Sequence, residues 1–258
     1  MSLHIENYGD GEPLVLLHGW GMHSGIWNNI VPPLSQHFRV YCVDLPGHGR
    51  SKRRLGALDT LDSIVDELSL QFTGQMNLCG WSLGGLVAMR WAQREQLRVQ
   101  RLALVASTPC FTKREDWHFG MEAETLRQFG AELEKDHVAT LRRFLSLQVR
   151  GSENERELLM DMRSRLFSHG QPEVEALRGG LEILREVDLR PELGSILQPT
   201  LLIAGERDKL TPPEASIYLS QALSKARLVE IAGAAHTPFL SHPEIFVKQI
   251  TDFMHERI

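Results

Sequence analysis

A serine flanked by glycines lies in the pentapeptide Gly80-Trp81-Ser82-Leu83-Gly84, which has the pattern G-x-S-x-G. Residues 75–79 before it are typical of a buried strand, and the small and apolar residues 85–92 are typical of a helix. A sharp strand-to-helix turn exposes the serine hydroxyl above the edge of a sheet and aims the next backbone N–H groups at the substrate. A side chain at either glycine would collide with the neighbouring backbone in so tight a turn. The pattern therefore predicts a nucleophilic Ser82 and a serine hydrolase.

A serine hydroxyl is a weak nucleophile near neutral pH, so Ser82 needs a base within hydrogen-bond reach and an acid that orients the base. Asp208 and His236 each follow a predicted strand, and the chain order of serine, acid and histidine is one that such triads use. Glu206 is an alternative acid, but Asp208 has the better position before Leu-Thr-Pro. We expect Ser82, Asp208 and His236 to form a catalytic triad.

Other histidines compete for the role of the base, because the chain has eleven of them. His236 stands out because small residues precede it and the strand order places it at the correct edge. His18 is expected to brace its own loop, and His242, which precedes a proline, is expected to start the last helix. The following histidines fall on predicted helices or exposed turns and are expected at the surface: His37, His118, His137, His169 and His255.

Hydrolysis by a serine also needs two N–H donors for the oxyanion that forms in the transition state. One donor is expected to be the backbone N–H of Leu83, the residue after the nucleophile. The other is expected to be the backbone N–H of Trp20, in the loop His18-Gly19-Trp20-Gly21 that follows the predicted strand 14–17. The two glycines of this loop allow the backbone to approach the substrate closely.

Short apolar runs alternate with helical patterns, which predicts an α/β fold with a mainly parallel sheet and helices on both faces. We expect residues 111–188, which contain helical stretches and no strand-like run, to form a helical cap over the carboxyl edge of the sheet. Residues 1–110 and 189–258 are expected to form the core. The expected strands are 14–17, 39–43, 75–79, 102–105, 200–204 and 227–231, and the expected helices are 61–72, 85–92, 122–133, 137–149, 153–167, 173–184 and 243–258.

Composition and charge exclude several classes of protein. The 258 residues are 42% hydrophobic and 24% charged, which suits a globular enzyme, and the net charge of -5 gives no support for nucleic-acid binding. No apolar run is long enough to cross a membrane, and no signal peptide is visible, so we expect a cytoplasmic protein. Cys42, Cys79 and Cys110 are too few and too scattered for a disulfide framework or a metal site. Cys42 and Cys79 lie in predicted strands and are expected to be buried, inert thiols.

Four motifs in the same order resemble the α/β-hydrolase superfamily over the whole chain. They are the turn at Ser82, the loop 18–21, the loops of the acid and the histidine, and the segment Asp44-Leu45-Pro46-Gly47-His48-Gly49-Arg50-Ser51. This last segment is similar to the D-x-P-G-x-G-x-S turn of the superfamily. The resemblance implies an eight-stranded, mostly parallel sheet with an inserted helical cap. The expected chemistry needs no metal and no organic cofactor.

A narrower resemblance is to the BioH family, the pimeloyl-[acyl-carrier protein] methyl ester esterases of biotin synthesis, and it rests on segments 18–21, 80–88, 107–111, 143–148 and 179–184. The resemblance implies hydrolysis of the methyl ester on a pimeloyl chain carried by phosphopantetheine, with methanol and pimeloyl-carrier protein as products. It implies an acyl path lined by Phe144, Leu145, Ser146, Leu147 and Gln148, with Trp20, Ser82, Leu83 and His236 near the ester. Spacing alone favours an ordinary helix core for Phe144 and Leu147.

Charge in the predicted cap gives an independent indication of the partner. Residues 139–165 contain six arginines and four acidic residues, although the whole chain is acidic. Arginine suits contacts with phosphate and carboxylate groups, and an acyl-carrier protein is expected to be acidic. We expect Arg142, Arg143 and Arg156 to contact the carrier protein, although a solvated helix surface explains the same count. We also expect a monomer that binds neither nucleic acid nor a membrane.

Two other functions stay open on the sequence. The first is a general short-chain carboxylesterase or a carbon–carbon bond hydrolase of the same fold, which differences in the cap would distinguish. The second is a non-catalytic receptor with a hydrolase fold, although the complete set of Ser82, Asp208 and His236 argues against it. A dehalogenase or epoxide hydrolase with an aspartate nucleophile is disfavoured, because the turn carries a serine.

Overall fold

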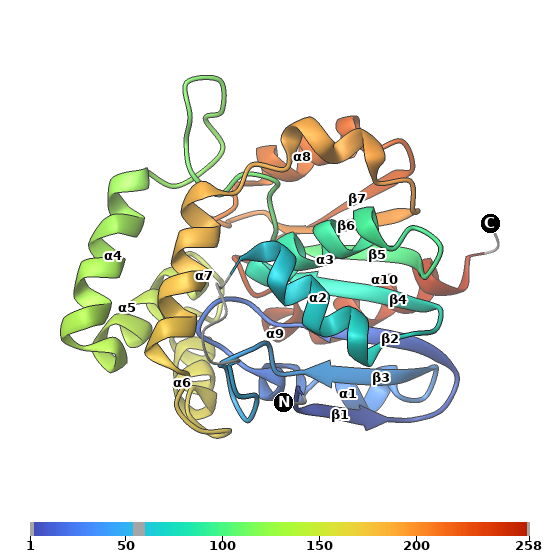
Figure 1. The fold of residues 1–258 in the computed structure, drawn as a ribbon, viewed down its shortest axis with the longest axis horizontal. Coiled ribbons are helices and arrows are strands. Elements are labelled where there is room, and N and C mark those ends of the chain that lie inside the picture. Colours follow the sequence, from blue (N-terminus) through green and yellow to red (C-terminus); the bar gives the residue numbers. More distant parts are fainter. Residues whose placement is uncertain (1–2, 54–59, 257–258) are drawn as a thin grey trace.

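A seven-stranded sheet forms the centre of the computed structural model, which describes residues 3–53 and 60–256 (Figure 1). The strand order is β1-β3-β2-β4-β5-β6-β7, in which β1 pairs antiparallel with β3 and all other neighbours pair in parallel. The strands are β1 (Ile5–Tyr8), β2 (Glu12–Leu17), β3 (Phe38–Val43), β4 (Met76–Trp81), β5 (Val99–Val105), β6 (Thr200–Gly205) and β7 (Ala226–Ile231).

The α/β architecture expected from the sequence, a mostly parallel sheet with helices on both faces, is confirmed. The expected number of eight strands is one too many for the described residues, which form seven. The short antiparallel β1 is the edge strand at its end of the sheet, and the described residues before it, 3 and 4, form no strand beyond it.

Helices cover both faces of the sheet, so β4 and β6 are buried along their whole length. This double burial explains why their sequences are continuous apolar runs rather than alternating patterns. Helix α3 (Leu83–Arg94) packs on β4 and β5 with α2 (Leu61–Gln71) beside it. The other core helices are α1 (Val31–Leu34), α8 (Pro213–Ala222), α9 (Pro238–Ser241) and α10 (Pro243–His255), with 3-10 helices η1 (Ser24–Trp27) and η2 (Arg190–Ser195).

The expected strands and helices agree with the structure to within a few residues at each end. The expected last helix, 243–258, ends at His255, and residues 257–258 lie outside the described part of the chain. The sequence analysis missed β1, α1, α8 and α9, as well as both 3-10 helices. Helix α8 was missed because two prolines mark its beginning, although proline in the first helical turn has a preset φ and lacks only an N–H that would be unpaired there.

Four consecutive helices lie together at the end of the sheet toward which the parallel strands point (Figure 1). Cys110 and Asp188 form an isolated antiparallel bridge, and the N–H of Leu189 donates to the carbonyl of Pro109 at 2.9 Å. The two segments that enter and leave the helical block are therefore side by side. The four helices are α4 (Ala123–Lys135), α5 (His137–Val149), α6 (Glu155–Arg165) and α7 (Val174–Glu186), inserted between β5 and β6.

All three cysteines are free and buried. Burial raises the pKa of Cys42 and of Cys79 to about 12, so neither is a thiolate at neutral pH. The expected inert thiols are thus confirmed.

Helix length and composition also bear on membrane insertion. Within residues 3–53 and 60–256, no helix combines the length and the apolar character that a membrane span requires.

Candidate active site

Ser82 lies in a strained turn between β4 and α3. Its backbone has a φ of 55° and a ψ of -118°, a conformation that residues other than glycine rarely adopt. A Cβ atom on Gly80 would overlap the carbonyl oxygen of Gly84, and a Cβ atom on Gly84 would overlap the carbonyl oxygen of Leu17. The steric reason expected for these two glycines is confirmed.

His236 lies between Ser82 and Asp208. Its Nε2 is 2.9 Å from Oγ of Ser82, and its Nδ1 is 2.8 Å from Oδ2 of Asp208. All three residues are buried, with at most 2% of their surface exposed. The alternative acid, Glu206, points elsewhere and accepts the N–H of Gly233 at 2.8 Å. The structure therefore brings the three predicted residues together at distances that allow proton transfer from Ser82 to His236.

The loop that follows β6 holds the carboxylate of Asp208. Oδ1 accepts the N–H groups of Leu210 and Thr211 at 2.8 and 3.0 Å, and Oδ2 accepts the hydroxyl of Thr211 at 2.7 Å. The same hydroxyl oxygen lies 3.3 Å from Nδ1 of His236. The sequence analysis gave Thr211 no role, although the spacing D-x-x-T in a loop favours such local hydrogen bonds.

Two hydrogen bonds hold the main chain of His236. Its N–H donates to the carbonyl of Gln148, near the end of α5, at 3.1 Å. Its carbonyl accepts the indole Nε1–H of Trp81 at 2.8 Å. Both bonds join segments far apart in the sequence, so no local pattern could predict them.

The two segments that carry the expected oxyanion donors both lie next to Ser82. Leu83 is the first residue of α3, so its N–H has no acceptor within the helix. The loop that carries Trp20 lies against the turn, because a Cβ atom on Gly19 would approach Cβ of Ser82 to 3.2 Å. Both segments are therefore close enough to the serine to supply donors, and the oxyanion hole itself remains a prediction.

The side chain of Trp20 contacts two helices of the inserted block. Its Nε1–H donates to the carbonyl of Leu177 in α7 at 2.8 Å, and its ring meets the ring of Phe144 edge-on with 4.8 Å between centroids. A Cβ atom on Gly180 would lie 2.6 Å from Cδ1 of Trp20 and 3.5 Å from Cδ2 of Leu83. The sequence analysis missed the contributions of Leu177 and Gly180 because their contacts cross from the inserted block to the core.

Helix α5 carries the residues expected along the acyl path. Phe144 contacts Trp20, and the carbonyl of Gln148 accepts the N–H of His236, so the structure brings Phe144 next to the loop of Trp20 and Gln148 next to the triad. Leu145 is buried, whereas Ser146 and Leu147 are half-buried. Within the described part of the chain, no hydrogen bond or ring contact joins residues 145–147 to the triad, and their role remains a prediction.

His18 is fully buried beneath the loop that carries Trp20. Its Nε2 accepts the N–H of Leu45 at 3.0 Å, so its Nδ1 carries the proton and donates to the carbonyl of Gly19 at 2.9 Å. Burial, and then the neighbouring His48, hold the pKa of His18 well below its usual range. His18 is therefore a neutral support for its loop and not a second base.

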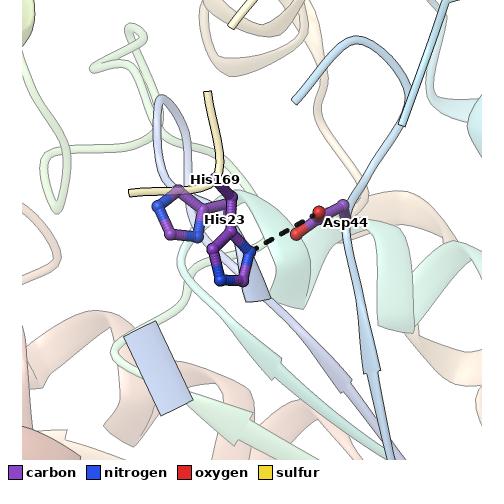
Figure 2. A group of neighbouring side chains, drawn as sticks. All are labelled: His23, Asp44 and His169. Atoms are coloured by element: carbon purple, nitrogen blue, oxygen red, sulfur yellow. Dashed lines mark ion pairs between the residues drawn. The ribbon is translucent and has the colours of Figure 1, made fainter. Parts of the chain in front are cut away.

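His23, Asp44 and His169 form a group of possible metal ligands, with ligand atoms within 4.8 Å of one another (Figure 2). Nδ1 of His23 accepts the N–H of Gly25 at 3.1 Å, and its Nε2 lies 2.8 Å from the carbonyl of Arg165. Both nitrogens of His23 are thus engaged, so the group does not offer three available ligand atoms.

The same group joins the inserted helical block to the core. His169 follows α6, and its ring stacks on His23 with 4.2 Å between centroids. The surface position expected for His169 is wrong, because only 11% of its side chain is exposed. Burial lowers the pKa of His169 and of His23. Burial alone would raise the pKa of Asp44, but hydrogen bonds from the backbone N–H groups of Arg50 and Ser24 contribute to an overall lowering.

The three arginines expected to meet a carrier protein are exposed on α5 and α6. Arg143 pairs with Glu132 and lies over the ring of Phe129, with its guanidinium carbon 4.8 Å from the centroid. Arg142 and Arg156 lie on the same two helices. Their contact with a carrier remains a prediction.

The fold and the site define the class of the protein. A family model described as alpha/beta hydrolase fold matches residues 12–243. The solved structure of an esterase from Exiguobacterium antarcticum superposes with a TM-score of 0.87 and covers 98% of this chain and 96% of its own, at 22% identity. At that identity the likeness concerns the fold alone. The chain is an α/β hydrolase.

Comparison with curated proteins identifies the family within the α/β hydrolases. A protein of Nitrosomonas europaea named pimeloyl-[acyl-carrier protein] methyl ester esterase is 49% identical over 246 residues, which are 95% of this chain and 97% of the relative. A protein of the same name from Nitrosospira multiformis is 43% identical over an alignment of 265 positions that covers 98% of each chain. The chain belongs to the family of pimeloyl-[acyl-carrier protein] methyl ester esterases, and the resemblance seen in the sequence is confirmed.

Proposed function

We propose that this protein hydrolyses the methyl ester of a pimeloyl group carried by an acyl-carrier protein and releases pimeloyl-[acyl-carrier protein] and methanol. The observation that carries the proposal is the hydrogen-bonded series Ser82, His236 and Asp208 in a chain 49% identical to a relative of that name. The protein is then a carboxylic ester hydrolase. Its product would serve biotin synthesis, as the resemblance to the BioH family implies.

In the first step, Oγ of Ser82 attacks the ester carbonyl carbon while Nε2 of His236 takes the hydroxyl proton. The N–H groups of Leu83 and Trp20 stabilise the oxyanion, and the loss of one such donor costs about 3 kcal/mol. Asp208 stabilises the imidazolium through Nδ1. His236 then gives its proton to the departing methoxide, so methanol leaves and the acyl group remains on Ser82.

In the second step, a water molecule attacks the acyl carbon while His236 takes one of its protons. The bond between the acyl carbon and Oγ of Ser82 breaks, and His236 returns the proton to Oγ. His236 therefore returns each proton that it takes, and one water molecule is consumed per ester. This sequence of steps uses no metal and no organic cofactor.

We further propose that residues 111–188 form a cap that binds the acyl chain, on a core made of residues 1–110 and 189–258. The bridge between Cys110 and Asp188 supports these boundaries. Phe144 beside Trp20 and Gln148 beside His236 support an acyl path along residues 144–148. The exposed arginines on α5 and α6 suit an acidic carrier protein.

We also propose that the protein acts as a monomer in the cytoplasm. Its exposed large apolar side chains are dispersed over several elements, which does not favour a protein interface; examples are Tyr8, Leu70, Met160 and Ile217. Three unpaired cysteines are typical of a reducing compartment.

The test compares two substrates and two proteins. Wild-type protein should release methanol from carrier-linked pimeloyl methyl ester with a higher kcat/KM than from short free methyl esters. Ser82→Ala protein, with an unchanged circular dichroism spectrum, should lose at least about a thousandfold in kcat. A preference for short free esters would instead indicate a general carboxylesterase. Turnover retained by Ser82→Ala would remove Ser82 from its role, and folded wild-type protein that resists a fluorophosphonate probe would indicate a receptor.

A further inference from the structure

The side chain of Trp81 contacts two loops of the proposed site. It is the last residue of β4, directly before Ser82, and its side chain is fully buried. Its indole Nε1–H donates to the carbonyl of His236 at 2.8 Å. A Cβ atom on Gly19 would come within 3.0 Å of its ring carbon Cε3, so the ring also lies against the loop of Trp20. One side chain thus contacts the histidine loop and the proposed oxyanion loop.

The sheet does not fix the position of His236 directly. Strand β7 ends at Ile231, and His236 follows in a loop before α9. The main-chain N–H of His236 is held by the carbonyl of Gln148, and its main-chain carbonyl is held by Trp81. Of these two partners, Trp81 belongs to a buried central strand, whereas Gln148 belongs to the inserted helical block.

We propose that Trp81 is a positioning residue that sets the distance between Oγ of Ser82 and Nε2 of His236. Trp81 acts through His236 and does not touch the reacting atoms. The inference rests on the triad of the proposed function and adds a residue to the support of that triad. Without the indole donor, the buried carbonyl of His236 would lack its partner, and the loop would move to satisfy it. A shift of about 1 Å in a reacting group lowers the rate about 100-fold.

The aromatic cluster around Trp81 offers a matched control. Trp27 meets Trp81 edge-on at 6.3 Å between centroids and packs against Phe239 at 4.4 Å. Both tryptophans are fully buried. Within the described residues, however, Nε1 of Trp27 has no hydrogen-bond partner. Trp27→Phe therefore removes a similar volume from the same cluster without removing a donor from His236.

A second variant separates the donor from the volume. The imidazole of Trp81→His can place Nε2–H at the ring position of the indole Nε1, and both Trp81→His and Trp81→Phe replace the bicyclic indole by one smaller ring. At about pH 8 a histidine with an ordinary pKa is neutral, so the substitution adds little charge. Trp81→His and Trp81→Phe then differ chiefly in the hydrogen bond to His236.

The experiment measures the rate at which a fluorophosphonate labels Ser82, together with kcat and KM for an activated acetate ester and the Tm of each variant. We expect Trp81→Phe to lose about 10- to 100-fold in labelling rate and kcat with an unchanged KM, as misplacement of a catalytic group does. Trp81→His should stay within about fivefold of wild type, and Trp27→Phe within about twofold, because neither lacks the donor. Trp81→Leu, which also lacks the donor, replaces Trp81→Phe if that variant does not fold.

Two results would overturn the proposal and assign Trp81 to packing alone. The first is an equal loss of labelling rate and kcat in Trp81→Phe and Trp81→His. The second is a loss in Trp27→Phe as large as that in Trp81→Phe. Because neither the probe nor the acetate ester involves a carrier protein, this outcome is independent of the natural substrate. A protein that is labelled as expected but does not hydrolyse the pimeloyl ester would contradict only the proposed function.

Discussion

The indole Nε1 of Trp20 lies 2.8 Å from the carbonyl oxygen of Leu177, so a helix of the inserted block holds the loop of a proposed oxyanion donor. Gly180 lies against the same indole and against Leu83, the other proposed donor. The geometry of the proposed oxyanion hole is therefore expected to depend on where α7 packs, although neither Leu177 nor Gly180 belongs to the triad.

Substitution of Gly180 by alanine tests this dependence. The new methyl group would lie 2.6 Å from Cδ1 of Trp20, so α7 or the indole must move. We expect kcat for ester hydrolysis to fall at least about 10-fold with little change in KM, because loss of a complete donor costs about 100-fold or more. Steady-state kinetics with a soluble ester measures the effect.

Gly130→Ala in α4 is the matched control. A Cβ atom at Gly130 meets no atom within 4 Å, so the substitution adds no contact. It should keep the wild-type kcat and stabilise the helix by about 0.5–1 kcal/mol. If Gly180→Ala is as active as Gly130→Ala, α7 does not set the oxyanion hole.

Thr211 gives a second prediction. Its hydroxyl donates to Oδ2 of Asp208 at 2.7 Å, the oxygen that also faces Nδ1 of His236. Thr211→Val removes this donor and nearly preserves the volume, and a hydrogen bond to a charged group contributes about 1.5–3 kcal/mol. We expect a fall of about 10-fold in kcat with unchanged KM, whereas Thr211→Ser should keep most of the activity. If Thr211→Val instead has the same kcat and the same pH profile as wild type, Asp208 needs only its two backbone donors.

Local signals predicted the triad and most of the core. Ser82 lies in a short motif with its own steric requirements, and Asp208 and His236 each follow a strand with a continuous apolar pattern. Chain order and strand direction then brought all three to one edge of the sheet, and the structure agrees.

The supporting contacts could not be predicted because they join distant segments. The bonds from Trp81 to His236 and from Trp20 to Leu177 each span more than 150 residues. They depend on how the helices pack, and a single sequence shows only that such residues are apolar. His169 was misplaced for the same reason, since a polar residue in a loop gives no sign that another loop will cover it.

The buried His18 predicts how stability depends on pH. An unfolded histidine titrates near pH 6.5, whereas burial holds the pKa of His18 below that value in the folded protein. Below about pH 6.5 the unfolded chain therefore binds a proton that the folded protein does not bind. The contribution of His18 to stability is complete above that pH and is lost progressively as the pH falls.

His18→Gln should reduce this acid sensitivity, because a glutamine carbonyl can accept the N–H of Leu45 and does not titrate. Burial also lowers the pKa of His23 and His169, so part of the dependence will remain. Urea unfolding at several pH values between about 5 and 8 should show a slope smaller by up to about 1.4 kcal/mol per pH unit. A slope equal to that of wild type would contradict the buried, neutral state of His18.

The exposed arginines predict a selective loss of carrier recognition. Arg142 lies on α5 and Arg156 on α6, and both are exposed to solvent. We expect Arg142→Glu and Arg156→Glu each to raise KM about fivefold for the carrier-linked ester, because like charges at an interface disfavour association. Neither should change kcat or the hydrolysis of a free ester, since both arginine side chains are exposed to solvent whereas the triad is buried.

Lys225→Glu is the matched control, because it makes the same change of charge at another exposed position. Lys225 directly precedes β7, so it lies at the amino ends of the parallel strands, away from the inserted helices. Its KM for the carrier-linked ester should stay within about twofold of wild type, and added salt should weaken carrier binding by wild type more than by the arginine variants. A KM that rises equally in Lys225→Glu would show that only net charge matters. A KM unchanged in both arginine variants would place the carrier on another surface, while the chemistry at Ser82 would be unaffected.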